Sequence, residues 1–196
     1  METIKKIILG SNSPRRRELM TGLNVPFEIR TIDNIDESFP RHMSVFEVPV
    51  YLAKKKADAY KPSLKPDEIV ITADTVVIVE NDILGKPHDY AEASSMLYRL
   101  SGKTHTVTTG TCITTSMEQS AFSVESEVTF KQLSRTEIDY YISHFKPFDK
   151  AGAYGIQEWI GYVGVTSLKG SYYNVMGFPI QRIYQELCNM GAIEIK

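Results

Sequence analysis

The chain has 196 residues, of which 42% are hydrophobic and 23% are charged, and its formal net charge at pH 7 is −2. This composition is typical of a folded globular protein and excludes a disordered or fibrous chain. The small net charge argues against a protein that binds nucleic acid through bulk electrostatics, so an anionic ligand would have to meet a local cluster of cations.

The sequence carries no pattern of a targeting or membrane segment. The apolar run at residues 7–9 is interrupted at once by polar residues and is too short for a signal peptide or a membrane span. We therefore expect a cytoplasmic protein that does not contact a membrane. Cys112 and Cys188 lie far apart in the sequence with apolar neighbours, which is typical of buried free thiols.

Strand-like and helix-like patterns alternate along the chain, which predicts an α/β protein. In the first half, Ser13 and Pro14 begin a helix that Gly22 ends. Ser44 and Glu47 form a capping box for a second helix that ends near residue 60. The strand patterns of this half cover residues 4–10, 27–32 and 69–79, and a hairpin turn follows at 81–82.

In the second half, Asp89 and Glu92 cap a helix that ends near residue 100. The remaining helices are expected at 136–145 and 179–190, and the remaining strands at 104–115, 121–130 and 162–168. Because hairpins alternate with helices, we expect a mixed sheet in place of a purely parallel one. No linker or repeat divides the sequence, which predicts a single domain over residues 1–196.

The segment 10–17 (GSNSPRRR) lies between the first strand and the first helix. Ser11 and Ser13 are small enough to let backbone N–H groups turn toward a ligand, and a helix N-terminus carries a partial positive charge. Arg15 and Arg16 add forked donors that suit phosphate oxygens. Cations at this end oppose the helix dipole, so an anion would relieve the conflict. The segment predicts either a phosphate site or a solvated basic turn.

Asp74 stands inside an apolar β pattern, ITADTVV at residues 71–77. A carboxylate is costly to bury unless its charge is compensated, and a divalent cation or a lysine would compensate it. Functional sites gather such groups, so we favour a functional role for Asp74 over a purely structural ion pair.

Three weaker signals occur elsewhere in the chain. Lys86 stands on a Gly-Lys-Pro turn from which it could reach a phosphate. The run 54–56 places three lysines on one helix, and at least one of them should face solvent. In the stretch 149–157 (DKAGAYGIQ), two glycines suggest backbone close to a ligand, with Asp149 and Lys150 at its rim.

Several common site patterns are absent from the sequence, including the Walker A, GxGxxG, HExxH and GxSxG motifs. The four histidines are isolated, so a histidine-bound zinc ion is not expected. Acidic residues together with arginine and lysine around glycine-rich turns suit magnesium and a polyphosphate.

Six segments of the chain resemble the Maf family of nucleotide pyrophosphatases, in the family's order and over nearly the whole length. They are LGSNSPRRREL (9–19), ADTVV (73–77), GKP (85–87), SGKTHTVTTG (101–110), DKAGAYGIQ (149–157) and NVMGFP (174–179). Each segment is modest alone, but together and in this order they are specific.

The resemblance implies an α/β fold with an elongated, curved mixed sheet, flanking helices and two lobes around a cleft, similar to the house-cleaning inosine triphosphate pyrophosphatases. It also implies a divalent metal cation (Mg²⁺ or Mn²⁺), a cytoplasmic location, frequent homodimers and a link to the arrest of septum formation.

By the same resemblance, the chain hydrolyses a nucleoside triphosphate to the monophosphate and pyrophosphate. Asp74 is the expected catalytic residue and, with Glu37, the expected metal ligand. The residues expected to bind the substrate are Ser11, Ser13, Arg15, Arg16, Glu37, Lys56, Thr75, Lys86, Lys150 and Gln157.

Arg15, Thr75 and Gln157 resemble the subgroup that acts on dTTP, UTP and related pyrimidine nucleotides. The subgroup that acts on 7-methyl-GTP tends to carry tryptophan in place of Arg15, where it would stack on a cationic base. A pyrophosphatase for 7-methyl-GTP or another modified nucleotide is therefore the alternative within this class. A non-catalytic nucleotide-binding regulator of cell division is the alternative from another class.

Overall fold

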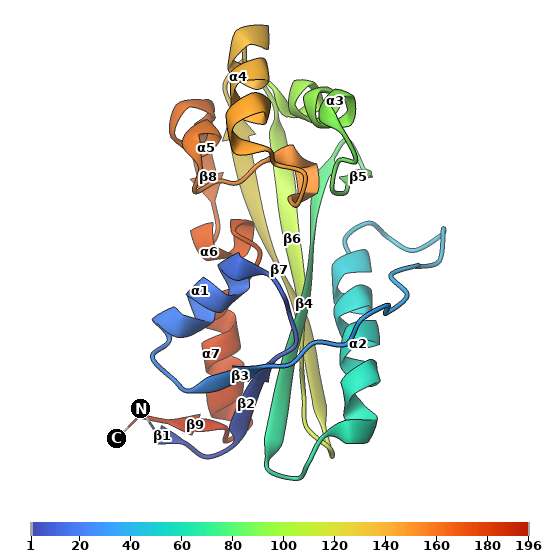
Figure 1. Cartoon of the computed structure of the whole chain (residues 1–196), viewed down its shortest axis with the longest axis vertical. Coiled ribbons are helices and arrows are strands. Elements are labelled where there is room, and N and C mark those ends of the chain that lie inside the picture. The colour runs from blue at the N-terminus through green and yellow to red at the C-terminus, as the bar shows by residue number, and fades with distance from the viewer. Residues whose placement is uncertain (1, 196) are drawn as a thin grey trace. The chain divides into compact units, whose positions relative to one another are not determined.

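The computed structural model describes residues 2–195 of the chain (Figure 1). The strands are β1 (Glu2–Thr3), β2 (Lys6–Leu9), β3 (Phe27–Ile29), β4 (Glu68–Val79), β5 (Asp82–Leu84), β6 (Thr104–Thr114), β7 (Gln119–Phe130), β8 (Val165–Lys169) and β9 (Ile193–Glu194). The α-helices are α1 (Pro14–Gly22), α2 (Val48–Tyr60), α3 (Tyr90–Leu100), α4 (Arg135–Phe145), α5 (Trp159–Gly164), α6 (Tyr172–Val175) and α7 (Ile180–Asn189). Two short 3-10 helices are η1 (Lys61–Ser63) and η2 (Ala151–Ala153). Within residues 2–195, no helix is long and apolar enough to cross a membrane.

The strands of the described residues form one seven-stranded sheet and one two-stranded sheet. The larger sheet has the order β3-β2-β4-β6-β7-β8, with β5 paired to β4, and the smaller sheet pairs β1 with β9. Strand β2 pairs in parallel with β3 and β4, whereas β5 pairs antiparallel with β4 and β8 pairs antiparallel with β7. The sheet is therefore mixed and flanked by helices, which confirms the predicted α/β class.

Contacts along the chain group it into two compact units. Unit 1 contains residues 2–74, 109–124 and 177–195, and unit 2 contains residues 75–108 and 125–176. Strands β4, β6 and β7 each contribute residues to both units. The single domain expected from the sequence stays a prediction.

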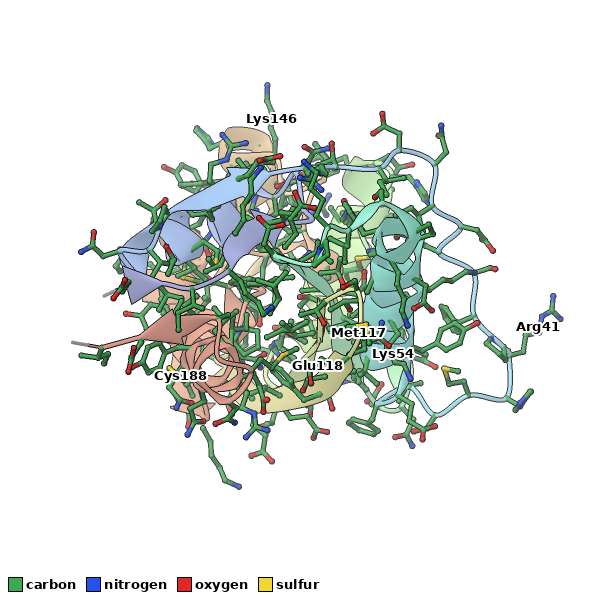
Figure 2. All side chains as sticks on the ribbon, turned by 90° about the horizontal axis from the view of Figure 1, so that it is seen from below. Arg41, Lys54, Met117, Glu118, Lys146 and Cys188 are labelled. Carbon is green, nitrogen blue, oxygen red and sulfur yellow. The ribbon has the colours of Figure 1, made fainter. Side chains whose placement is uncertain are left out.

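In unit 1, α2 lies on one side of the strands, and α1 and α7 lie on the other (Figures 1 and 2). Helix α2 packs directly on the backbone of β6 at Gly110. A Cβ atom at Gly110 would lie 2.1 Å from the backbone nitrogen of Val50 and 2.3 Å from the carbonyl oxygen of Pro49. Ala53 of the same helix is fully buried in a cluster with Cys112. Small residues at these positions allow the close approach that fixes α2 against the sheet.

In unit 2, His105, Phe130 and Tyr154 form a buried aromatic cluster. The ring centroids of His105 and Phe130 are 5.2 Å apart, and those of Phe130 and Tyr154 are 5.0 Å apart. His105 Nε2 and the Tyr154 hydroxyl lie 2.7 Å apart in a hydrogen bond. Burial lowers the pKa of His105 to about 4, so this histidine is neutral at pH 7. The cluster is part of the core.

Several elements begin and end where the sequence predicted. The Ser13 side chain accepts a hydrogen bond from the backbone of Arg16 at the start of α1, and Asp89 caps α3 in the same way. Glu80 and Asn81 adopt positive φ angles of 53° and 66° in the hairpin turn between β4 and β5, one residue earlier than expected.

Other predicted elements are wrong or incomplete. Ser44 and Glu47 form a turn in which Glu47 N–H donates to the Ser44 carbonyl (2.9 Å), and α2 begins later, at Val48, with Pro49 in its first turn. Residues 162–164 belong to α5, because pairing with β7 begins only at Val165. Strand β3 ends at Ile29, and β1, β9 and α6 were not predicted. Cys112 is buried as expected, whereas Cys188 is half-buried, and both are free cysteines.

We predict that Gly110→Ala destabilises the protein by about 3 kcal/mol or more, because the new methyl group would overlap backbone atoms of α2 that cannot move alone. Urea unfolding measures the change. Gly22→Ala is the matched control, since a Cβ atom at Gly22 meets no atom within 4 Å, and it should change stability by less than about 1 kcal/mol. Equal stability of the two variants would contradict the close packing at Gly110.

Candidate active site

Strand β4 is buried along its length except at Asp74 and Thr75. The Asp74 side chain keeps 15% of its surface exposed. Strand β4 is thus partly accessible to solvent at Asp74 and Thr75. The predicted position of Asp74 inside an apolar strand is confirmed. A carboxylate placed there is both desolvated on most sides and accessible to a small molecule.

Lys56 compensates the charge of Asp74. Its ammonium nitrogen lies 2.6 Å from Asp74 Oδ1 and 2.9 Å from Glu37 Oε1. Lys56 projects from α2 with 16% of its side chain exposed, so it is more desolvated than an ordinary surface lysine. Two carboxylates from distant parts of the sequence therefore converge on one cation, which compensates the largely buried charge of Asp74.

Glu37 lies on the irregular loop that joins β3 to α2 and extends outward to Arg41 (Figure 2). Asp36 Oδ1 accepts a hydrogen bond from Ser38 N–H (2.9 Å), and Asp36 Oδ2 accepts one from the Ser38 hydroxyl (2.6 Å). Lys55 Nζ donates to Asp36 Oδ2 (2.7 Å) and to the Ser38 carbonyl (3.0 Å). The Lys55 hydrogen bond, followed by those from Ser38, holds the pKa of Asp36 well below its usual range. These contacts fasten a turn that has Glu37 at its centre.

The N-terminal turn of α1 supplies the next group of side chains. Ser11 Oγ accepts a hydrogen bond from Ser13 N–H (3.2 Å). The Arg16 guanidinium donates to the carbonyl oxygens of Ala73 (2.7 Å) and Gly177 (2.9 Å), and Nη1 lies 3.4 Å from Ser11 Oγ. Arg16 therefore reaches the residue that precedes Asp74 and braces the strand there.

The charge of Arg16 is costly in this position. Burial lowers the pKa of Arg16, the Asp74 carboxylate opposes this shift, and the nearby charge of Arg15 adds to it. Two arginines at a helix N-terminus repel each other and oppose the helix dipole. An anion bound at this turn would be attracted to both arginines. The predicted phosphate site therefore stays a hypothesis.

Unit 2 holds Thr75, Lys86, Lys150 and Gln157. Lys150 is buried, and its ammonium nitrogen lies 2.7 Å from Asp149 Oδ1 and 3.1 Å from Glu158 Oε1. Lys86 is exposed. The structure thus holds Lys150 between two carboxylates of unit 2 and leaves Lys86 exposed.

Gln157 is half-buried, and its Oε1 atom is fully buried without a hydrogen-bond partner within residues 2–195. A buried acceptor without a donor costs roughly 1–3 kcal/mol. Local geometry explains why residue 152 of the same stretch is glycine. Its φ is 67°, and a Cβ atom there would lie 2.9 Å from a methyl carbon of Val77.

A divalent cation fits the donor set of unit 1. No cluster of three or more histidine, cysteine, aspartate or glutamate side chains occurs within residues 2–195. Mg²⁺, however, is usually bound by one or two carboxylates, with water and substrate phosphates as the other ligands. Glu37 and Asp74 supply two such carboxylates beside one nitrogen atom, so they fit a cation that arrives with a polyphosphate.

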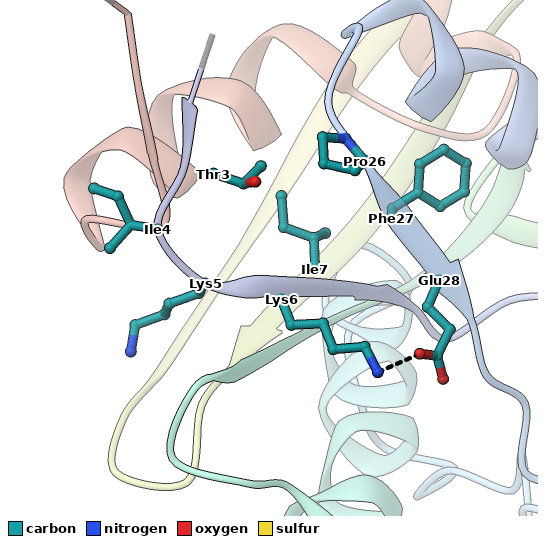
Figure 3. Close-up of a pocket in the computed structure, with 8 residues that line it drawn as sticks. All are labelled: Thr3, Ile4, Lys5, Lys6, Ile7, Pro26, Phe27 and Glu28. Atoms are coloured by element: carbon teal, nitrogen blue, oxygen red, sulfur yellow. Dashed lines mark ion pairs between the residues drawn. The ribbon is translucent and has the colours of Figure 1, made fainter.

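A cavity of about 420 Å³ lies elsewhere in unit 1, beside β2 and β3 (Figure 3). Lys6 and Glu28 form an ion pair at its edge. None of the predicted site residues lines this cavity. It is therefore separate from the carboxylate cluster.

Sequence reasoning missed the residues that hold the candidate side chains in place. Lys55 was visible as part of the lysine run, and Glu158 directly follows Gln157. Tyr141, which donates a hydrogen bond to the Glu158 carboxylate, gave no signal because an apolar helix face commonly carries tyrosine. The usable signal for Lys55 and Glu158 was that each is a charged residue next to a predicted site residue in the sequence.

The fold and site describe a mixed α/β protein with a carboxylate pair suited to a metal and basic side chains suited to an anion. The structure of a HAM1 protein from Coxiella burnetii shares this fold, with a TM-score of 0.51 and 13% sequence identity, covering 94% of this chain and 99% of that chain.

The family is shown by sequence. The family model described as Maf-like protein matches residues 6–190, so the chain belongs to the Maf family. A dTTP/UTP pyrophosphatase of Phocaeicola vulgatus is 54% identical over 93% of this chain and 94% of its own length. A dTTP/UTP pyrophosphatase of Parabacteroides distasonis is 53% identical over 95% of this chain and 98% of its own length. The predicted resemblance is confirmed.

We predict that Arg16→Lys lowers the free energy of unfolding by about 1–3 kcal/mol, because one ammonium group cannot serve the carbonyl oxygens of both Ala73 and Gly177. Urea unfolding measures the loss. Arg17→Lys on the exposed side of the same helix is the matched control and should stay within about 0.5 kcal/mol of the parent protein. An unchanged midpoint for Arg16→Lys would show that its guanidinium does not brace β4.

Proposed function

We propose that this chain is a pyrophosphatase that hydrolyses dTTP, UTP and related pyrimidine nucleotides to the monophosphate and pyrophosphate. The observation that carries the proposal is the cluster of Glu37, Lys56 and Asp74, in which two carboxylates and a cation meet where β4 opens to solvent. The choice of substrate is supported by relatives with more than half of their residues identical, which are named dTTP/UTP pyrophosphatases.

Asp74 is the catalytic residue in this proposal. It orients the attacking water and accepts its proton as the water oxygen attacks the α-phosphorus and pyrophosphate leaves. Lys56 keeps the carboxylate in one position through its short contact with Oδ1. Glu37 and Asp74 would hold the divalent cation, Mg²⁺ or Mn²⁺, which when bound offsets negative charge on the phosphate oxygens.

In this proposal, the cationic side chains act mainly on the triphosphate. Arg16, Lys56 and Lys86 offset the charge that develops on the phosphate oxygens, which is usually the largest electrostatic contribution to phosphoryl transfer. Ser11, Ser13 and Lys150 bind the phosphate chain. The backbone amides of the turn before α1 add to this binding, because a helix N-terminus attracts anions.

Gln157, Arg15 and Thr75 select the base in this proposal. Thymine and uracil carry an N–H group at N3, whereas cytosine carries an acceptor there. The half-buried Gln157 amide, whose Oε1 atom has no hydrogen-bond partner within residues 2–195, would accept a hydrogen bond from that N–H group if it faces the base, but would face a lone pair in cytosine. Arg15 would repel a cationic base such as 7-methylguanine. The side chain of Gln157 thus favours dTTP and UTP over cytidine nucleotides.

We predict that Asp74→Asn reduces the rate of pyrophosphate release from dTTP by at least about 100-fold, because an amide cannot accept the proton of the attacking water. Asp58→Asn on α2 removes a carboxylate that bonds Gln119 and serves as the matched control with near-parental turnover. Circular dichroism checks that both variants are folded.

Near-parental turnover by Asp74→Asn would remove Asp74 from the mechanism. Nucleotide binding without release of pyrophosphate or orthophosphate in the parent protein would favour the non-catalytic regulator.

We predict that kcat/KM for dTTP exceeds that for dCTP, and that Gln157→Ala lowers this ratio by about tenfold, because the alanine variant loses the acceptor for the N3 proton. A pyrophosphate assay with Mg²⁺ and a panel of dTTP, UTP, dCTP and 7-methyl-GTP measures the ratio. Faster turnover of 7-methyl-GTP than of dTTP would instead favour the modified-nucleotide alternative.

A further inference from the structure

We propose that Tyr141 is a positioning residue that fixes the turn formed by residues 155–158 and thereby the side chain of Gln157. Tyr141 touches neither the proposed phosphate ligands nor Asp74 in any described contact, and no role was assigned to it by sequence. The inference rests on the proposed function, because it matters for catalysis only if Gln157 selects the base.

The turn begins at Gly155 and ends at Glu158. Glu158 N–H donates to the Gly155 carbonyl oxygen (3.0 Å), which leaves Gln157 as a central residue of a four-residue turn. The Tyr141 hydroxyl accepts a hydrogen bond from Gly155 N–H (3.0 Å) and donates one to Glu158 Oε2. One hydroxyl group therefore binds both ends of the turn that presents Gln157.

Tyr141 itself is held firmly. It lies on α4, its side chain is fully buried, and its ring stacks on that of Phe145 with 5.2 Å between centroids. Burial, and then the bond to Glu158, raise the pKa of Tyr141, so the hydroxyl stays protonated and remains a donor. The helix begins with a full capping box at Ser134 and Glu137, which fixes its register.

The carboxylate of Glu158 connects this turn to Lys150. Glu158 Oε1 accepts from Lys150 Nζ (3.1 Å), and the same nitrogen bonds Asp149 (2.7 Å). The Lys150 side chain is only 9% exposed, so its charge needs these partners. Tyr141 and Lys150 thus hold Glu158 by both carboxylate oxygens, and the end of the turn cannot swing out without breaking charged contacts.

Close packing leaves the turn little room to change shape. A Cβ atom at Gly155 would lie 3.0 Å from the Glu158 carboxyl carbon and 3.2 Å from Gln157 Nε2, so both side chains fold over Gly155. A Cβ atom at Gly161 would lie 1.8 Å from the Ile156 carbonyl oxygen, so α5 presses on the centre of the turn. Gln157 Nε2 is thereby placed beside Gly155, while its buried Oε1 keeps an unfilled acceptor.

The test compares Tyr141→Phe with Tyr140→Phe. Both changes remove one hydroxyl group from adjacent residues of α4, but Tyr140 is exposed and makes ring contacts with His144 and Trp159 instead. In Tyr141→Phe, the ratio of kcat/KM for dTTP to kcat/KM for dCTP should fall by about tenfold, toward that of Gln157→Ala, because a bond to a charged group is lost. Tyr140→Phe should keep the parental ratio.

The ratio of kcat/KM for dTTP to kcat/KM for dCTP distinguishes a positioning role of Tyr141 from an effect on the stability of the fold. A general loss of folded protein lowers turnover of both nucleotides equally and leaves the ratio unchanged. A parental ratio in Tyr141→Phe, together with a lowered ratio in Gln157→Ala, would overturn the inference and leave the proposed function standing. A parental ratio in Gln157→Ala would overturn the proposed base selection instead.

A second measurement tests the turn without substrate. Hydrogen exchange at the Gly155 amide should be about tenfold faster in Tyr141→Phe than in Tyr140→Phe, because the amide loses its acceptor. Equal exchange in the two variants would overturn the inference whatever the activity. Should Tyr141→Phe fail to fold, Glu158→Gln weakens the same contacts, and it should lower the nucleotide ratio by about threefold. An unchanged ratio in that variant would likewise overturn it.

Discussion

The ion pair between Lys56 and Asp74 is the interaction on which the candidate site depends. It places a compensating nitrogen 2.6 Å from a carboxylate that stands inside an apolar strand. The same nitrogen atom also forms an ion pair with Glu37, which lies on an irregular loop. Removing the cation would leave the largely buried Asp74 carboxylate without this compensating charge and close to the exposed Glu37 carboxylate, so the two like charges would repel each other.

The packing of α2 determines where that cation lies. Gly110 allows the backbone of α2 to contact the sheet. This contact sets the distance between α2 and the sheet that the Lys56 side chain spans to reach β4. Arg16 fixes the strand from the other side by bonding the carbonyl of Ala73, directly before Asp74. The position of the Asp74 carboxylate thus follows from two contacts that involve backbone atoms. Such contacts are less free to move than contacts between long side chains.

Turns present two of the proposed functional side chains, and each turn is braced by a residue from a helix. In unit 1, Lys55 bonds the turn that carries Glu37. In unit 2, Tyr141 bonds both ends of the turn that carries Gln157. A loop residue without such braces would lose side-chain and backbone freedom on binding a ligand, and that ordering would weaken binding.

The sequence by itself determined the alternation of strands and helices, the caps at Ser13 and Asp89, and the site candidates, because these depend on neighbours within a few residues and on a specific order of motifs. It misassigned the start of α2 and residues 162–164, where proline placement and strand pairing overrode local preference. Only the tertiary structure decided that Lys56 is the partner of Asp74, that Arg16 bonds backbone, and that Tyr141 holds the turn at Gln157. Those contacts join residues distant along the chain, and their formation depends on how helices pack on the sheet, which no short-range pattern encodes.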